Sequence, residues 1–358
     1  EQPLTYWNAE GALAGMGLVL CARLAGDPAR SRRTRMLAAG VTPALAVGLW
    51  LVYSRGALAA TGAGLVVLAA AAPTWSQLRS LAVTLVLAGA AIVPVTFFAT
   101  ISSAAGGARA ERNGAIYLAV LLLLAGVGAA ATREGIRRER SGRLATGRVP
   151  LPRGSTLLAT IVVVAGAAAL IYFASRERAR PIRGGSAATA ARLTNIDSNR
   201  YAYWKVAGRA LGDHPLKGLG AGGFANAWIQ QRPVRDPAVY AHSLELETGA
   251  NLGIVGLLGL AGLLGGVGVA ATRAQRLRPE LVAGWSAATV VWLLHSSIDW
   301  DWEMPAVTLV ALTLGGALVG VADGPGEPGG APEPPARLTA HNLETARRAR
   351  APEDQPSS

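Results

Sequence analysis

Repeated apolar runs of about 18–20 residues constrain the fold of this chain more than any other feature. One of them, Gly114–Ala131, carries no charged residue. A run of this length can cross the hydrocarbon core as an α-helix, because a helix satisfies its own backbone polar groups in lipid. A membrane β-strand would instead alternate in hydrophobicity, which this run does not. The sequence therefore predicts an all-α polytopic membrane protein.

The composition agrees with this class. Only 16% of the 358 residues are charged, whereas a soluble domain carries about 25% charged residues. The mean hydropathy is +0.33. A net charge of +12 would suggest nucleic acid as the partner of a soluble protein. Here the basic residues cluster between apolar runs, so we interpret them as determinants of membrane topology and expect no nucleic-acid partner.

We expect about nine transmembrane helices. They lie approximately at Ala9–Leu24, Met36–Tyr53, Ala57–Ala72, Leu81–Thr100, Gly114–Ala131, Thr156–Ala174, Ala250–Ala271, Leu281–Ile298 and Pro305–Val321. Residues 1–322 then form a transmembrane domain into which residues 175–249 are inserted as one long loop. The tail, residues 323–358, is rich in Pro, Gly and Glu, which predicts disorder.

Arginines are concentrated in three short loops, Gly26–Arg35, Thr132–Ser155 and Thr272–Glu280. With alternating spans, all three lie on one face of the membrane, and the positive-inside rule assigns that face to the cytoplasm. The long loop Ser175–Gly249 is then extracytoplasmic, and the tail is cytoplasmic. We expect short helices within the long loop.

The long loop is itself basic and begins its folded part with a predicted helix. This helix runs from Arg200 to about Gly212, because polar residues before it offer an N-cap and Pro215 prevents its continuation. Arg200 and Trp204 share a face at helical spacing, so the indole can hold the guanidinium by stacking. The basic side chains suit either anionic lipid headgroups or substrate phosphates, and both interpretations stay open.

His242 and Arg55 are further candidates for a site. His242 lies just before the span Ala250–Ala271, within the basic loop, and a neutral imidazole suits general-base work near neutral pH. Arg55 lies at the extracytoplasmic end of the second span. A lone histidine is more often structural, and an arginine at the end of a span often reaches toward the interface.

Two other segments resemble binding motifs in their amino-acid pattern, but we do not interpret either as a binding site. Gly218–Gly223 reads GLGAGG, but a dinucleotide site needs a preceding strand and a following helix, so we interpret this segment as a tight turn and expect no cofactor. Asp299–Glu303 alternates acidic residues with tryptophans. Three carboxylates on a short loop are too few to predict a metal site, and we interpret the segment as an interface turn with His295 as a packing residue.

Five segments, spread over almost the whole chain before the tail, form an ordered set of motifs. They are LTYWNAEG, YSRGALAA, RYAYWKVAGRALGDHPLKGLGAGGF, AHSLELETGANLGIVG and HSSIDWDWEMP. In this order they resemble the Y-P-N-A, S-R-G, R-x-x-x-W…D-H-P-L-x-G, H-[NS]…G-[LI]-x-G and H…D…P segments of the O-antigen ligase / Wzy-type polymerase superfamily. Members of this superfamily are polytopic inner-membrane glycosyltransferases that use lipid-linked glycans.

The resemblance implies transfer of a glycan from polyprenyl (undecaprenyl) pyrophosphate at the extracytoplasmic face of the bacterial inner membrane, without a metal. Arg55 and Arg200 match the arginines of the family that hold the donor pyrophosphate. His242 matches the histidine proposed to activate the acceptor hydroxyl, with inversion at the anomeric carbon. Further side chains expected to bind substrate are Trp204, Arg209 and Lys217.

Several alternatives stay open. A ligase would use a glycan, lipid or protein acceptor, a polymerase another lipid-linked repeat unit, and a transporter or flippase would use the basic loop as a gate. Charges at span ends rather than mid-span favour the enzyme. Asn251 stands where the family commonly has Glu, so any catalytic role of that Glu is absent or moved to Glu245 or Glu247. Members usually carry more spans before the first motif, and we expect this sequence to begin within a longer protein.

Overall fold

The computed structural model describes residues 4, 6–98, 101, 106–150 and 198–324. These residues form α-helices, one short 3-10 helix and no β-strand, which confirms the all-α fold class. The elements are α1 (Trp7–Gly26), α2 (Arg32–Leu51), α3 (Arg55–Ala71), α4 (Trp75–Val95), α6 (Ala108–Arg140), α9 (Arg200–Asp213), α10 (Gly223–Gln231), α11 (Leu244–Leu277), α12 (Pro279–Ser296), η1 (Asp301–Glu303) and α13 (Pro305–Ala322).

Six of these helices are long and apolar enough to cross a membrane, namely α1, α2, α4, α6, α11 and α13. The shorter apolar helix α3 and helix α12 lie at two more of the expected spans. The expected span Thr156–Ala174 and the expected disordered tail beyond residue 324 lie outside the described residues. Helices α6 and α11 have 33 and 34 residues, more than the roughly 20 that a bilayer requires, so parts of both project beyond it.

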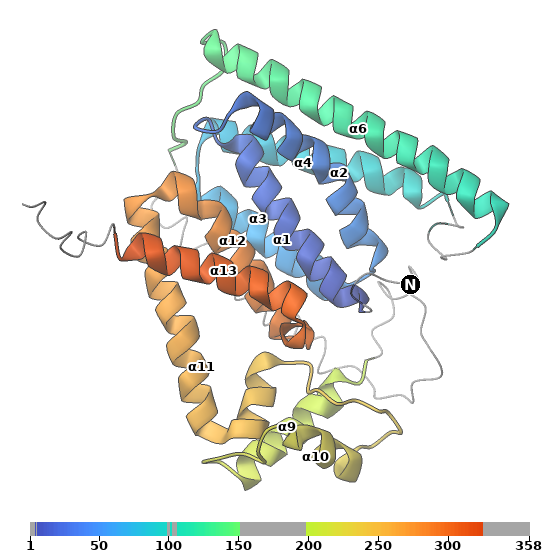
Figure 1. Ribbon diagram of the computed structural model, residues 1–358, viewed down its shortest axis with the longest axis vertical. Helices are drawn as coiled ribbons and strands as arrows, with labels where there is room; N and C mark the ends of the chain where they lie inside the picture. Colours follow the sequence, from blue (N-terminus) through green and yellow to red (C-terminus); the bar gives the residue numbers. More distant parts are fainter. Residues whose placement is uncertain (1–3, 5, 99–100, 102–105, 151–197, 325–358) are drawn as a thin grey trace, which may run out of the picture. The chain divides into compact units, whose positions relative to one another are not determined.

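Small residues allow the membrane helices to approach closely. Helix α1 packs against α2, α3, α4 and α12 (Figure 1). A Cβ added to Gly15 of α1 would lie 2.1 Å from the Thr61 Oγ1 of α3, and one added to Gly64 of α3 would lie 2.4 Å from a methyl group of Val291 in α12. Because lipid tails are as apolar as the side chains, such close van der Waals packing is what associates helices in a membrane.

The three arginine-rich loops meet at one end of these helices. Arg35 donates to Glu139 at 2.9 Å, which joins the start of α2 to the end of α6. Arg23 near the end of α1 donates to the carbonyl of Glu280 at the start of α12. Gln275 near the end of α11 donates at 2.7 Å to the last turn of α3. The predicted placement of these loops on one face therefore agrees with the contacts between the helices.

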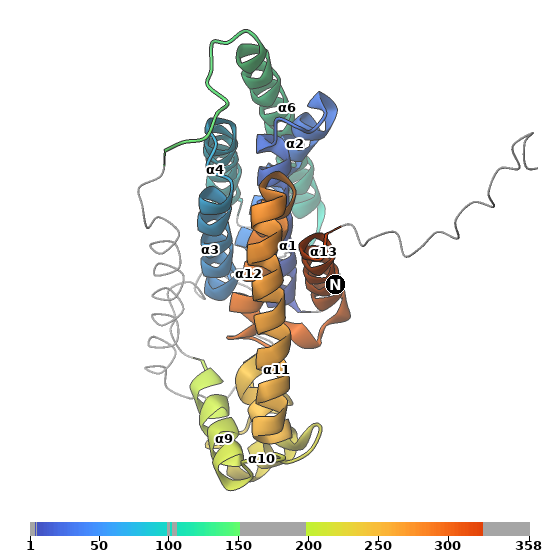
Figure 2. The same cartoon turned by 90° about the vertical axis from the view of Figure 1, so that its left-hand side faces the viewer.

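A second hydrophobic core lies outside the membrane helices, between α9, α10 and the first turns of α11 (Figure 2). It is built on Tyr203, Phe224 and Trp228, all buried. The indole of Trp228 donates to the backbone carbonyl of Asp236 at 2.8 Å. The carboxylate of Asp236 accepts hydrogen bonds from the Tyr203 hydroxyl and from Asn199, so the loop before α11 is tied to α9.

The glycine-rich segment forms the expected tight turn and docks on a break in α11. Gly218, Gly220 and Gly222 all have positive φ, a conformation that glycine adopts without a Cβ clash. Helix α11 is interrupted at Gly253, with φ 63° and ψ −156°. The amide of the next residue donates to the Pro215 carbonyl at 2.8 Å, so the turn supplies an acceptor at the break.

Candidate functional site

A buried carboxylate at the end of α12 connects three distant parts of the chain. The side chain of Asp299 is 1% exposed. Its Oδ1 accepts a hydrogen bond from the Tyr6 hydroxyl at 2.6 Å, and its Oδ2 accepts one from Asn8 at 2.7 Å and one from the Arg200 guanidinium at 2.6 Å. A buried carboxylate stays ionised only when its charge is matched and its lone pairs are satisfied. Both conditions are met here.

The ionisation of Asp299 follows from this arrangement. Burial opposes its charge, but Arg200, His242 and His295, with the hydrogen bond from Tyr6, hold the pKa of Asp299 well below its usual range. The first motif of the chain, which supplies Tyr6, thus meets the arginine of the third motif and the aspartate of the fifth. The three motifs form one cluster at the end of the helices opposite the arginine-rich loops.

Arg200 is the first residue of α9 and remains partly accessible. Its side chain is 26% exposed while one guanidinium nitrogen bonds to Asp299. Trp204, one turn later on the same face, donates from its indole nitrogen to the backbone carbonyl of His242 at 3.2 Å. The helix predicted from Arg200 is therefore present, and its first turn is attached to the candidate base.

His242 is held in an unusual backbone conformation. Its φ is 56°, in the left-handed region that a non-glycine residue adopts only under surrounding constraint. Its Nδ1 lies 3.0 Å from the Tyr240 carbonyl, and its ring stacks on Tyr203 with centroids 4.9 Å apart. Because a carbonyl can only accept, Nδ1 carries the proton and the Nε2 of the neutral ring has a lone pair.

The protonation of His242 is set mainly by burial. Burial lowers the pKa of this imidazole, Arg200 lowers it further, and Asp299 and the Tyr240 carbonyl act in the opposite direction, leaving it below its ordinary value. The neutral form, which can accept a proton, is therefore favoured near pH 7.

Arg55 begins α3 at the same end of the helices as Asp299. The N-cap is Ser54, whose hydroxyl accepts a hydrogen bond from the amide of Ala57 at 3.2 Å. The next residue, Gly56, faces the end of α12, because a Cβ added there would lie 2.8 Å from the Ile298 side chain. The arginine of the second motif thus lies one residue from a contact with the segment that carries Asp299.

The other two basic candidates lie elsewhere. Arg209 and Lys217 are exposed and lie toward the far end of α9. Arg209 is about 13 Å along the helix axis from Arg200 at 1.5 Å per residue. The structure does not bring them into the cluster around Asp299, so a role in binding would require a substrate that extends along α9.

The acidic segment after α12 is the turn into α13, and both of its aspartates are buried. Asp299 and Asp301 are 1% and 0% exposed. Asp301 lies in the 3-10 helix η1, with its carboxylate 3.0 Å from the Nδ1 of the equally buried His295. The fifth motif, H…D…P, marks this segment in the sequence, but it does not indicate that Tyr6 and Asn8 are the partners of Asp299. Among the described residues, no group of three or more His, Cys, Asp or Glu side chains is arranged to hold a metal.

The unusual residues around α11 have distinct contacts. Asn251 accepts a hydrogen bond at 2.9 Å from the backbone amide of Phe224, at the start of α10. Glu247 is buried and accepts from the amide of Ala241 at 2.8 Å. Glu245 accepts from the Ser297 hydroxyl at 2.7 Å, two residues before Asp299. Of these three side chains, Glu245 is joined to the segment that carries Asp299.

The apolar helices and the polar cluster at their ends define a multi-pass α-helical membrane protein. Residues 108–261 match the family model described as O-antigen ligase. This match covers less than half of the chain; it supports the O-antigen ligase superfamily, in agreement with the resemblance, and an enzyme of the glycosyltransferase type. The matched segment contains Arg200 and His242 but neither Arg55 nor Asp299. No curated protein matches the chain.

Proposed function

We propose that this protein transfers a glycan from a polyprenyl-pyrophosphate donor to an acceptor hydroxyl, with His242 as general base and Arg200 and Arg55 as ligands of the pyrophosphate. The observation that carries the proposal is the cluster itself. A neutral histidine and a partly accessible arginine are joined through Trp204, and the arginine is fixed by Asp299. This combination provides a proton acceptor beside a site for a pyrophosphate leaving group, whose negative charge increases as the bond breaks.

The proton transfer uses the free ring nitrogen of His242. With Nδ1 donating to the Tyr240 carbonyl, Nε2 accepts the proton of the acceptor hydroxyl as its oxygen attacks the anomeric carbon. The bond between this carbon and the phosphate oxygen breaks, and polyprenyl pyrophosphate leaves with the electron pair. Attack from the face opposite the leaving group inverts the anomeric configuration.

The arginines stabilise the negative charge that develops on the departing phosphate oxygens. Asp299 is a positioning residue in this scheme, since it fixes the Arg200 side chain by a 2.6 Å ion pair. Trp204 holds the backbone of the base. Because pyrophosphate is already a good leaving group and the arginines balance its charge, we expect transfer without a divalent metal.

The membrane orientation completes the proposal. The cluster lies at the end of the helices opposite the arginine-rich loops, and with the positive-inside rule this supports an extracytoplasmic site, which we propose for a bacterial inner membrane. There the lipid tail of the donor can stay in the bilayer while its pyrophosphate reaches the cluster. The acceptor is a glycan, lipid or protein hydroxyl.

The test is turnover by the purified full-length protein in nanodiscs, with polyprenyl-pyrophosphate oligosaccharide, a panel of acceptors, and with or without EDTA. We expect polyprenyl pyrophosphate to be released, and His242→Ala to lower the rate about 10²–10⁴-fold. His214→Ala is the matched control, because His214 is an exposed histidine of the same loop. Product size separates a ligase from a polymerase.

Two outcomes would overturn the proposal. Normal turnover by His242→Ala would remove the assigned base. Donor binding without release of polyprenyl pyrophosphate, with every acceptor, would favour the transporter over the enzyme.

A further inference from the structure

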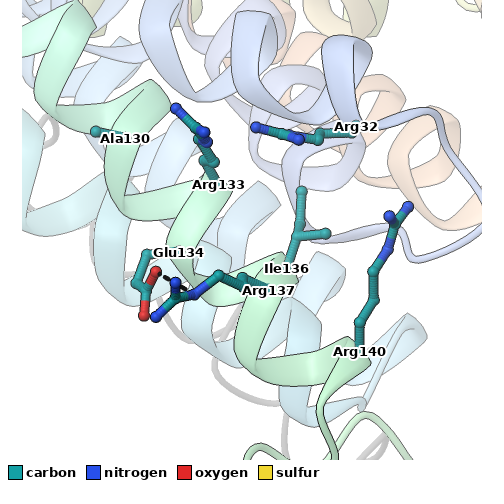
Figure 3. Close-up of a pocket in the computed structure, with 7 residues that line it drawn as sticks. All are labelled: Arg32, Ala130, Arg133, Glu134, Ile136, Arg137 and Arg140. Carbon is teal, nitrogen blue, oxygen red and sulfur yellow. Dashed lines mark ion pairs between the residues drawn. The ribbon is translucent and has the colours of Figure 1, made fainter.

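A basic hollow lies at the other end of the helices, between the start of α2 and the end of α6. Its volume is about 400 Å³, and its arginines are Arg32 of α2 with Arg133, Arg137 and Arg140 of α6 (Figure 3). Ile136 is also in its lining. A second hollow of about 190 Å³ shares Arg32, Ile136 and Arg140, so the two form one basic region.

Two acidic residues, Glu134 and Glu139, also line these hollows, and both are already paired. Glu134 lies 3.1 Å from the guanidinium of Arg137 and 2.8 Å from that of Arg138. Glu139 is buried and bonds to Arg35 at 2.9 Å, as well as to a second arginine and a serine hydroxyl of α4. These carboxylates therefore have little capacity left to balance further positive charge.

Three arginines of the hollow have no such partner. In the part of the chain that the structure describes, no carboxylate lies within ion-pair distance of Arg32, Arg133 or Arg140. All three side chains are exposed, and Figure 3 shows them drawn around the same hollow. Arginines that only fix topology need not share a cavity, whereas convergence from two helices is the arrangement that binds phosphate oxygens.

Apolar side chains are exposed along both helices that form the hollow. Leu37 and Val41 of α2, and Leu122, Leu123 and Val127 of α6, are exposed and follow the two helices away from the arginines. Figure 1 shows α2 and α6 running alongside each other. These exposed side chains are where the acyl chains of a lipid with its phosphate in the hollow would lie along the two helices.

We propose that this hollow binds the phosphodiester headgroup of an anionic phospholipid, with its acyl chains along α2 and α6. The site is distinct from the cluster around Asp299, because α2 separates the two ends by about 30 Å. Basic pockets at the ends of membrane helices hold anionic headgroups by this combination of charge and adjoining hydrocarbon. The proposal is independent of the proposed glycan transfer.

The test is native mass spectrometry of the delipidated full-length protein, titrated with phosphatidylglycerol or phosphatidylcholine. We expect tight binding of phosphatidylglycerol alone, weakened about fivefold by Arg133→Gln and about a hundredfold by Arg32→Gln, Arg133→Gln and Arg140→Gln together. The matched control replaces three exposed arginines at the same end of the helices by Gln, namely Arg273 and Arg276 in the last turns of α11 and Arg278 after it. It should bind as the wild type does.

Three outcomes would overturn the proposal. Equal weakening by the control would mean a general attraction to positive charge. Equal binding of phosphatidylcholine would remove the requirement for an anionic headgroup. Displacement of bound phosphatidylglycerol by millimolar inorganic phosphate would identify a free-phosphate site instead. A combined Arg→Lys variant at the three positions checks folding, because it keeps the charge and should keep most of the phosphatidylglycerol binding.

Discussion

Replacing Asp299 by Asn perturbs the cluster without changing its shape. The Oδ1 of Asp299 accepts from the Tyr6 hydroxyl and from the Trp300 amide, and its Oδ2 accepts from Asn8 and Arg200. An asparagine can keep an oxygen at the first position, but it then presents an NH₂ group to two donors at the second. The variant therefore loses two hydrogen bonds and the charge that balances Arg200.

The magnitude follows from these two bonds. A hydrogen bond to a charged group contributes about 1.5–3 kcal/mol, so losing both costs at most about 3–6 kcal/mol. Asn8 can turn its amide over and offer an oxygen to the new NH₂ group, which recovers part of this loss. We expect a net decrease in the free energy of unfolding of about 2–4 kcal/mol, and a Tm lower by roughly 3–6 °C.

The stability difference between wild type and the Asp299→Asn variant should also depend on pH in a definite direction. Because the pKa of Asp299 is lowered in the folded state, its contribution to stability is complete above the unfolded pKa of about 3.9 and is lost as the pH falls through the folded pKa. Asparagine does not titrate. The stability difference between wild type and variant should therefore be constant from pH 8 to about 5 and narrow below about pH 4.

The assay is thermal unfolding of both full-length proteins in nanodiscs from pH 8 to pH 3. The control is Asp213→Asn, which removes an exposed carboxylate at the far end of α9 and should change the stability by less than about 0.5 kcal/mol. An Asp299→Asn variant with the wild-type Tm at pH 7, or a difference that persists unchanged to pH 3, would refute the argument.

Three further predictions concern the base and the packing around it. Because burial lowers the pKa of His242, the rate of glycan transfer should be constant from pH 8 to about 6.5 and fall only at lower pH; a decline between pH 8 and pH 7 would contradict this. Trp204→Phe keeps an aromatic ring but removes the indole N–H that donates to the His242 carbonyl. We therefore expect kcat to fall with little change in the KM for donor, and the free energy of unfolding to fall by about 0.5–1.5 kcal/mol. Gly56→Ala puts a methyl group 2.8 Å from Ile298 and should destabilise by about 1–3 kcal/mol in thermal unfolding, whereas Gly62→Ala, with nothing within 4 Å, should stabilise by up to about 1 kcal/mol.

Most of the helices are predictable from the sequence, because each membrane span is encoded in one continuous hydrophobic run. Eight of the nine expected spans have a helix in the described residues. The errors lie at the ends of long helices, such as α6, which continues through Arg133 to Arg140. A span predicted from hydropathy ends at the first charged residue, whereas the helix continues beyond the membrane boundary because its backbone hydrogen bonds do not depend on hydropathy.

The candidate site is less predictable, because it depends on contacts between distant residues. Arg200 and His242 could be named from their motifs and their place before α11. The role of Asp299 could not, because its partners Tyr6 and Asn8 are 293 and 291 positions away and no local periodicity reports such a contact. Arg209 and Lys217 were named for their positive charge in the same loop, but they lie away from the cluster, and their role in binding stays a prediction.

The distances along the chain between Asp299 and its partners also affect how the protein is made. Asp299 follows Arg200 by 99 positions and leaves the ribosome after α11 and α12. Until then Tyr6, Asn8 and Arg200 lack their common acceptor, even if the small core around α9 has already folded. The cluster is therefore completed late in biosynthesis, after nearly the whole helical domain has been inserted, and a nascent or prematurely terminated chain would carry an unassembled site.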